Sequence, residues 1–299
     1  MAEIFSPNES LLTQTKKLLQ QHELKAKKGL GQHFLVDSSV LKDITRAAEL
    51  TPNDLVIEIG PGLGVLTREL IRRSGYVIAV ELDNHLAELL KENLKTFHNV
   101  SIVSADILAT EPWELIQRVK SDLPPATKEP FKYKVVANLP YYITQPVIRH
   151  FCEARLKPQM MVIMVQKEVA KNIVALPGDL SILAVAVQYF GKPEIAGYVP
   201  AANFHPKPKV DSAILKIEMY AEPPVQVTSE KHFFKVVRAG FCAARKQIGN
   251  SLSQGLDIPK AEVLSLIQKA AVAPEKRAET LSLEEWARLE RVFAEVKRP

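Results

Sequence analysis

Three glycines after a predicted strand are the first residues whose spacing points to chemistry. Gly60, Gly62 and Gly64 follow the apolar run 55–59 and begin a segment of helical periodicity. Glycines at such a junction let the backbone turn tightly and approach a ligand closely. The spacing is G-x-G-x-G, and Val65 stands where the dinucleotide fingerprint G-x-G-x-x-G has its third glycine, which disfavours NAD.

Two carboxylates follow the next two predicted strands. Glu81 ends the run 76–80, about twenty residues beyond the glycines, where a carboxylate can accept hydrogen bonds from ribose hydroxyls. Asp106 follows the run 100–103, from where a carboxylate could reach an adenine amino group. Either acid by itself is more often a solvated loop residue. Because ligands of open α/β sheets bind at the carboxyl ends of the strands, the three signals together favour one shared ligand site.

A second candidate centre follows the fourth predicted strand, 133–137, and consists of Asn138, Leu139, Pro140 and Tyr141. Asn-x-Pro is a common turn and the tyrosine can belong to a core, so the tetrapeptide alone fits a structural role. In this position it resembles the (N/D)-P-P-(Y/F) motif of enzymes that methylate exocyclic amines. The glycine motif and its two carboxylates resemble the S-adenosylmethionine site of class I methyltransferases.

The chemistry of amine methylation accounts for these residue types. The lone pair of an adenine N6 is delocalised into the ring, so the amine is a poor nucleophile until acceptors engage its two N–H bonds. The Asn138 side-chain oxygen and the Leu139 carbonyl can be those acceptors, and Tyr141 can stack on the base. The cofactor's sulfonium is already an excellent methyl donor, so positioning dominates and no strong general base is required.

Further segments make the resemblance more specific. The segment 28–35 (KGLGQHFL), the segment 203–212 (NFHPKPKVDS) and two C-terminal segments, 241–252 (FCAARKQIGNSL) and 277–286 (RAETLSLEEW), resemble the ribosomal RNA adenine dimethyltransferases. The similarity runs from about residue 11 to the C terminus. Within that family the chain is most similar to the branch that dimethylates two adjacent adenosines near the 3′ end of small-subunit (16S) rRNA, in small-subunit biogenesis.

The resemblance implies a role for each matching position. The implied cofactor contacts are His33, Leu35, Gly60, Gly62, Gly64, Glu81, Asp106 and Asn138. The implied catalytic and target-base residues are Asn138, Leu139, Pro140, Tyr141 and Phe204, with Phe204 facing Tyr141 across the base. His33 departs from the commoner asparagine, and residues 242–245 carry fewer arginines than the usual form. By sequence alone, Phe204 beside two prolines could equally pin a loop to the core.

The bulk composition is that of a globular protein with a mild basic excess. The 299 residues are 46% hydrophobic and 24% charged, with a net charge of +5 that suits a polyanionic partner. Two cysteines offer neither a disulfide framework nor metal-ligand spacing, so we expect no metal and a reducing cytoplasm. No apolar run approaches a membrane span and the N terminus lacks the apolar segment of a secretory signal.

The pattern of elements explains how these residues are positioned. Strands alternate with helices as far as about residue 219, which predicts an α/β fold with a doubly wound, mostly parallel sheet. Only helical segments follow Glu222-Pro223-Pro224. We therefore expect an S-adenosylmethionine-binding catalytic domain over residues 1–220 and a small helical domain that docks on RNA or the ribosome over 221–299.

Basic residues provide the expected contacts with small-subunit rRNA. Two groups could follow RNA phosphates, although each member alone is more often a solvated surface charge: Lys207, Lys209, Lys231, Lys235, Arg238, Arg245 and Lys246, and Lys16, Lys17, Lys25, Lys27 and Lys28. A monomer is the simplest expectation, because this partner requires no symmetric dimer.

Three other functions stay open. A large-subunit rRNA methyltransferase of the antibiotic-resistance type is disfavoured by Leu139, where that branch tends to have isoleucine, and by the helical tail. A DNA adenine methyltransferase is disfavoured by the segment 28–35 and by the lack of a DNA-reading module. A non-catalytic nucleic-acid-binding factor is disfavoured by the intact Glu81, Asp106 and Asn138. The sequence leaves open the order of methyl additions and the choice between free RNA and an assembled subunit.

Overall fold

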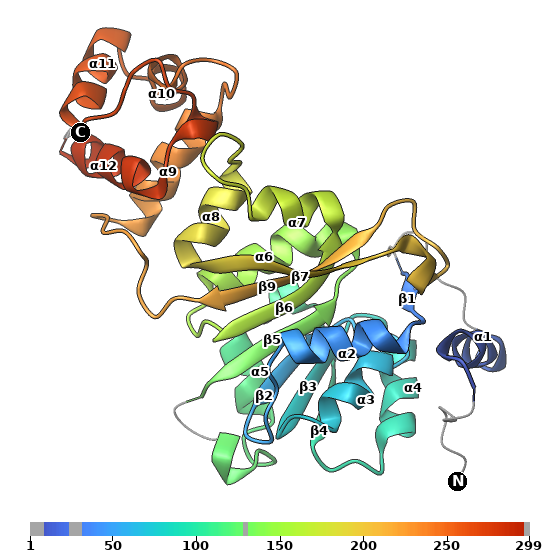
Figure 1. Ribbon diagram of the computed structural model, residues 1–299. Coiled ribbons are helices and arrows are strands. Elements are labelled where there is room, and N and C mark those ends of the chain that lie inside the picture. The colour runs from blue at the N-terminus through green and yellow to red at the C-terminus, as the bar shows by residue number, and fades with distance from the viewer. Residues whose placement is uncertain (1–8, 24–31, 128–130, 296–299) are drawn as a thin grey trace. The chain divides into compact units, whose positions relative to one another are not determined.

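A seven-stranded sheet forms the centre of the N-terminal part of the chain (Figure 1). The computed structural model describes residues 9–23, 32–127 and 131–295, so residues 28–31 of the segment 28–35 and Lys25 and Lys27 lie outside the described residues. The strand order is β4-β3-β2-β5-β6-β9-β7. The predicted α/β fold with a doubly wound, mostly parallel sheet is confirmed.

Five strands are parallel because helices connect them on the faces of the sheet. They are β2 (Leu55–Ile59), β3 (Tyr76–Glu81), β4 (Val100–Ser104), β5 (Tyr133–Asn138) and β6 (Met160–Gln166). All five residues of β2 and all six of β3 are buried, as expected for strands covered on both faces. β9 (Ser212–Met219) returns antiparallel to β6, and β7 (Gly191–Val199) forms the edge.

Helices cover both faces of the sheet. α2 (Ser38–Ala47), α3 (Val65–Ile71) and α4 (Asn84–Leu94) bury their apolar sides with sheet residues in one hydrophobic core. α5 (Pro112–Arg118) and α6 (Thr144–Glu153) lie behind the sheet in Figure 1. Asp37 begins α2 by accepting a hydrogen bond from the Ser39 N–H.

Two short elements position the residues that precede the sheet. α1 (Leu11–Gln21) is a short helix, and its Leu19 packs against a cluster formed by Phe34, Leu63 and Leu86. β1 (Phe34–Leu35) pairs antiparallel with β8 (Phe204–His205), so that Phe34 lies opposite His205 and Leu35 opposite Phe204. This pairing joins segments about 170 residues apart in sequence, and nothing in the local pattern predicted it.

The chain divides into two compact units. The first contains residues up to 170 and 194–219, and the second contains 171–193 and the residues from 220 onward. The second unit resumes at residue 220 and also takes residues 171–193, whereas the domain bounds expected from the sequence, 1–220 and 221–299, assign those residues to the first domain. Those residues belong there because Tyr189 stacks on Phe233 with ring centroids 4.7 Å apart, and the Gly178 and Leu180 N–H groups donate to the Glu279 carbonyl.

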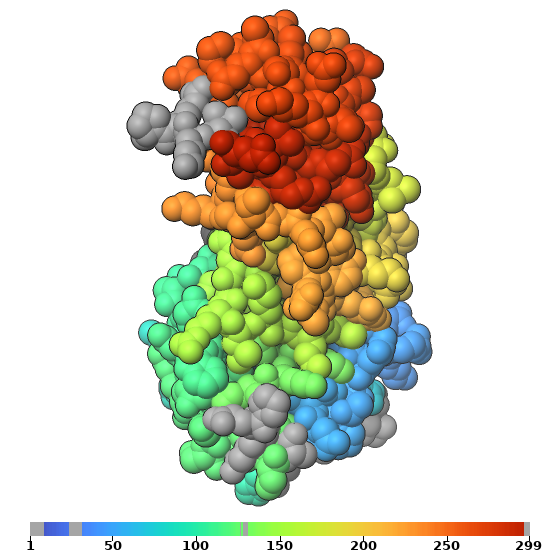
Figure 2. All heavy atoms as spheres, turned by 90° about the vertical axis from the view of Figure 1, so that its left-hand side faces the viewer, coloured from blue at the N-terminus to red at the C-terminus, as the bar shows by residue number. Residues whose placement is uncertain are grey.

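The second unit is helical, as expected. α7 (Lys167–Ile173) crosses the division, and α8 (Ile182–Phe190), α9 (Glu230–Phe241), α10 (Ile248–Leu256), α11 (Lys260–Lys269) and α12 (Leu283–Ala294) follow. Figure 2 shows α9 to α12, orange to red, as one continuous mass. Trp286 is fully buried at their centre, and a capping box between Ser282 and Glu285 begins α12.

Candidate active site

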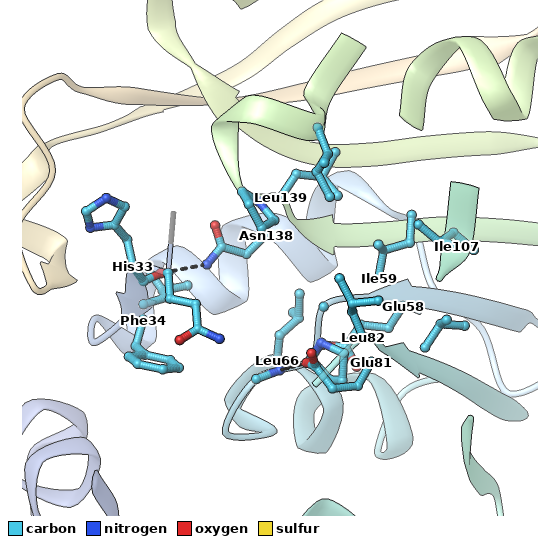
Figure 3. Close-up of a pocket in the computed structure, with 18 of the residues that line it drawn as sticks. His33, Phe34, Glu58, Ile59, Leu66, Glu81, Leu82, Ile107, Asn138 and Leu139 are labelled. Carbon is cyan, nitrogen blue, oxygen red and sulfur yellow. Dashed lines mark hydrogen bonds between the residues drawn. The ribbon is translucent and has the colours of Figure 1, made fainter. Parts of the chain in front are cut away.

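A cavity of about 300 Å³ opens at the carboxyl ends of the parallel strands (Figure 3). Its walls come from the residues that follow β2, β3, β4 and β5, together with the segments 32–35 and Phe204. The volume lies at the lower end of the range for small-molecule sites, about 300–1,000 Å³. Eleven of the twelve residues singled out from the sequence line it: His33, Leu35, Gly60, Gly62, Glu81, Asp106, Asn138, Leu139, Pro140, Tyr141 and Phe204.

The glycine loop has the backbone shape that its sequence suggested. Gly62 lies in the left-handed region with φ 58°, and a Cβ added there would come within 3.3 Å of the Phe34 ring. Gly64 is the exception among the predicted site residues, because it does not line the cavity. It is the N-cap of α3 with φ 79°, and a Cβ there would lie 2.6 Å from Leu90 Cδ2. Gly64 therefore lets α3 pack closely on α4.

The Glu81 carboxylate is fixed by the backbone around it. Its two oxygens accept hydrogen bonds from the Gly62 N–H at 3.1 Å and from the Asp83 N–H at 2.9 Å. Burial raises the pKa of Glu81, and these backbone donors act in the opposite direction. The orientation is thus set before any ligand binds, which suits a carboxylate that has to accept from hydroxyl groups.

A second carboxyl group, Glu58, lies at the cavity wall and was not singled out from the sequence. Its side chain is 1% exposed, and Oε2 makes no hydrogen bond to any described residue. Burial raises the pKa of Glu58 to about 8, and the neighbouring Thr67 hydroxyl, which lowers it, does not offset the desolvation. Glu58 is therefore protonated at neutral pH, and Glu81 does not face a second negative charge there.

Apolar side chains at the strand ends complete this side of the cavity. Leu82 and Leu108 line it although they are 54% and 36% exposed, and the buried Ile107, which directly follows Asp106, lines it as well. Asp106 accepts a hydrogen bond from the Leu108 N–H at 2.9 Å, which fixes the turn. Leu82 directly follows Glu81, and Ile107 and Leu108 come next after Asp106, so the position of these apolar residues beside the two acids is the signal that could have identified them in the sequence. Exposed apolar groups beside oriented carboxylates suit a flat ring carrying polar groups.

Asn138 occupies the wall at the end of β5. Its Nδ2 donates to the His33 carbonyl at 3.2 Å, and its Oδ1 accepts no hydrogen bond from any described residue (Figure 3). Among the described residues the amide oxygen is therefore left as an acceptor for a ligand, as methylation of an amine requires. Leu139, which follows, is 2% exposed at its side chain.

Two aromatic residues line the cavity beyond Asn138. The Tyr141 hydroxyl hydrogen-bonds Ser212 Oγ at 2.8 Å, and burial raises the pKa of Tyr141, so the phenol is neutral. Phe204 is 4% exposed and belongs both to the cavity wall and to the hydrophobic core. The two interpretations left open for Phe204 are thus compatible, since it pins its loop through β8 and also presents a surface to the cavity.

Neither a cluster of metal ligands nor a membrane-spanning helix occurs among the described residues. Within 9–23, 32–127 and 131–295, no three His, Cys, Asp or Glu side chains gather in a way that could hold a metal ion. No helix in the same ranges is long and apolar enough to cross a membrane.

The chain is similar to known proteins over most of its length. Residues 23–295 match the family model for "Ribosomal RNA adenine dimethylase". A "Ribosomal RNA small subunit methyltransferase A" of Dehalococcoides mccartyi is 49% identical over 96% of this chain and 94% of its own length. The protein of that name from Moorella thermoacetica is 42% identical over 93% of this chain and 96% of its own length.

Solved structures resemble the chain over most of its length. A 23S rRNA methyltransferase, ErmE, is 30% identical with a TM-score of 0.67, and the match covers 87% of this chain and 99% of that one. A dimethyladenosine transferase from Plasmodium falciparum has a TM-score of 0.71 over 86% of this chain and 96% of that one, and at 24% identity it supports the fold alone. The family match over nearly the whole sequence confirms the resemblance drawn from the motifs: the chain belongs to the ribosomal RNA adenine dimethylase family.

Proposed function

We propose that this chain transfers methyl groups from S-adenosylmethionine to the N6 atoms of two adjacent adenosines near the 3′ end of small-subunit rRNA. The observation that carries the proposal is Asn138, whose Oδ1 accepts no hydrogen bond from the part of the chain that the structure describes and lies in a cavity that also holds the oriented Glu81 carboxylate. The choice of the small subunit is supported by the names of relatives that are 42–49% identical over almost their whole lengths.

The cavity fits the cofactor that the family uses. Gly60 leaves open space where a Cβ would stand, so the chain can approach a ligand at the end of β2. Glu81 would accept from the ribose hydroxyls, and Asp106 would receive the adenine amino group between apolar neighbours. Leu35, Gly62 and Asn138 complete the proposed cofactor wall. When bound, S-adenosylmethionine supplies an activated methyl group on its sulfonium.

The target base would lie on the other side of Asn138. The Asn138 amide oxygen and the Leu139 carbonyl would accept from the two N6–H bonds, which makes the nitrogen pyramidal and its lone pair available. Tyr141 would stack on the adenine, with Pro140 shaping the turn and Phe204 facing the opposite surface of the ring. The neutral Tyr141 phenol stays with Ser212, so the proton released by the methylated amine passes to water.

An rRNA substrate has consequences for the surface that binds it, for the oligomeric state of the chain and for its location in the cell. An unpaired loop of rRNA costs least to open for a base that has to enter a pocket. The lysines and arginines at 207–246 would contact phosphates, and the second unit would dock on the ribosomal subunit. We infer a monomer acting in the cytoplasm, where ribosomal subunits are assembled.

One other function has a specific observation in its favour. The 23S rRNA methyltransferase of known structure is 30% identical and covers most of the chain, so a large-subunit adenosine is the second candidate substrate. The two candidate functions share the chemistry proposed for Asn138 and differ only in whether the target adenosine belongs to small-subunit or to large-subunit rRNA.

The deciding experiment is methyl transfer to separated ribosomal subunits. Purified protein is incubated with radiolabelled S-adenosylmethionine and with small or large subunits from cells that lack the modification, and the labelled nucleosides are identified after digestion. We expect label in dimethyladenosine from the small subunit alone. Label from the large subunit alone would move the chain to the second candidate, and no transfer by a protein that binds the cofactor would refute the rRNA assignment.

A variant separates an enzyme from a binding factor. Removal of the Asn138 amide (Asn138→Ala) should lower the rate of methyl transfer about 10²–10³-fold, as loss of one oriented partner of a transition state does, and should leave ribosome binding intact. Asn53→Ala is the matched control, because Asn53 is an exposed turn residue outside the cavity. Full activity in Asn138→Ala would show that the amide plays no part in the reaction.

A further inference from the structure

His33 lies where three segments that are distant in sequence meet. It directly precedes β1, and the antiparallel pairing of β1 with β8 brings residue 33 next to Pro206. The loop that follows β5 lies on another side of His33. The family resemblance implies a cofactor contact at this position, but the contacts of the imidazole point elsewhere.

Within residues 9–23, 32–127 and 131–295 the structure shows two contacts of the imidazole ring, and neither involves the glycine loop. Nδ1 lies 2.7 Å from the carbonyl oxygen of Pro206. Because a carbonyl oxygen only accepts, Nδ1 must carry the proton of this hydrogen bond. The ring also stacks on Tyr141, with centroids 6.0 Å apart and 29° between the planes, within the range where aromatic pairs attract. The hydrogen bond thus fixes the imidazole, and the imidazole supports one side of the Tyr141 ring.

The opposite end of Tyr141 is also fixed, through its hydroxyl and Ser212 Oγ at 2.8 Å. A phenol ring rotates about bonds that a single hydroxyl contact does not restrain, so a second contact on the ring itself is required to fix its plane. His33 provides that contact. Its backbone carbonyl accepts from Asn138 Nδ2, so one residue touches both ends of the tetrapeptide 138–141.

The His33 imidazole points away from the side of the cavity that is proposed to hold the cofactor. Figure 3 shows the His33 imidazole pointing away from Glu81 and Leu66, whereas the His33 carbonyl faces Asn138. A side chain that pointed into the cofactor site would approach the Glu81 side of the cavity.

We propose that the His33 side chain is a positioning residue for the target base, which holds Tyr141 in its stacking orientation and does not contact the cofactor. The inference rests on the proposed function, because Tyr141 is assigned there to the base.

Three substitutions at His33 separate its two contacts. His33→Phe keeps a ring against Tyr141 and loses the Nδ1–H donor, whereas His33→Asn keeps a donor and loses the ring. Each should lower kcat/KM for the ribosomal subunit about 2- to 12-fold, and His33→Ala, which loses both contacts, by up to about 100-fold. The Kd for S-adenosylmethionine, measured calorimetrically, should stay within about twofold in all three. His98→Ala is the control, because His98 is exposed and lies outside the cavity.

A double-mutant cycle tests whether His33 acts through Tyr141. If it does, His33→Ala adds little to the loss already caused by Tyr141→Ala, because the ring it supports is gone. Losses that multiply would overturn the proposal. A weakened Kd for S-adenosylmethionine with unchanged kcat at saturating cofactor would also overturn it and restore the cofactor contact.

The wild-type chain assayed in parallel separates two kinds of failure. A wild type that binds the cofactor and methylates neither subunit refutes the proposed function, and the inference with it. An active wild type together with a fully active His33→Ala variant refutes this inference alone.

Discussion

Replacement of the buried Glu58 by glutamine should change how stability depends on pH. Glu58 has an ordinary pKa of 4.5, and burial raises its pKa in the folded chain to about 8. Below the lower value the carboxyl group is protonated in both states. Between the two values the unfolded chain loses the proton and the folded chain keeps it. The free energy of unfolding therefore falls by about 1.4 kcal/mol for each pH unit. Above the higher value both states are ionised and the penalty is constant.

The magnitude follows from the two pKa values. Over the whole interval between the two pKa values the free energy of unfolding falls by about 4.8 kcal/mol, and between pH 5 and pH 7 it falls by about 2.5 kcal/mol. Glutamine does not titrate, so Glu58→Gln escapes this loss. Whatever constant effect the amide has on packing, the advantage of the variant over the wild type should therefore grow with pH.

Thermal unfolding of the cofactor-free protein measures the effect. At about 2–4 °C per kcal/mol for chains of this size, Tm of Glu58→Gln minus Tm of the wild type should rise by about 5–10 °C between pH 5 and pH 7. Glu88→Gln is the control, since the Glu88 side chain is 70% exposed and its difference should change by no more than about 2 °C. If the Tm difference between Glu58→Gln and the wild type changes with pH no more than that of the control, Glu58 is already ionised in the folded chain and the reasoning is wrong.

Two more substitutions test the role of Gly64 in the packing of α3 and the role of Glu81 at the cavity wall. Gly64→Ala should lower Tm by about 2–8 °C, because alanine at φ 79° costs about 1–2 kcal/mol before its contact with Leu90 is counted. Gly197→Ala, whose new Cβ would meet only ordinary contacts, should lower Tm less, and equal losses would contradict the assignment. Glu81→Gln should weaken S-adenosylmethionine binding about 10- to 150-fold in a calorimetric titration, because hydrogen bonds to a charged acceptor are lost. Since the pKa of Glu81 is raised, wild-type affinity should fall with decreasing pH before the ordinary value of 4.5 is reached, and unchanged binding in Glu81→Gln would exclude the ribose role.

The strands and the end of the sheet that carries the site could be predicted from sequence because local patterns specify them. Apolar runs such as 55–59 and 76–80 form strands buried on both faces, and glycines or acids mark where they end. The carboxyl ends of parallel strands share one edge, so Gly60, Glu81 and Asn138 had to lie near one another once the strands were known. Their chemical types then suggested a nucleoside ligand and an amine acceptor.

Only the tertiary structure decided which residues join the site from elsewhere in the chain. The two-residue strands β1 and β8 are too short to leave a periodic signal, yet their pairing places Phe204 at the cavity and His33 against Tyr141. The allocation of 171–193 to the second unit likewise depends on long-range packing, as in the contact of Tyr189 with its partner ring.

The roles of Gly64 and Glu58 were decided in the same way. Both residues lie in the segment 58–64, but a glycine at a helix start and a carboxyl group at a strand end can each face either a ligand or a neighbouring helix. Gly64 lies against Leu90, where it allows α3 to pack closely and does not line the cavity. Burial at the cavity wall keeps Glu58 protonated. Sequence specifies which local elements form and what chemistry their ends carry. Burial and long-range contacts, which depend on every other element, determine which of those groups meet and in which charge state.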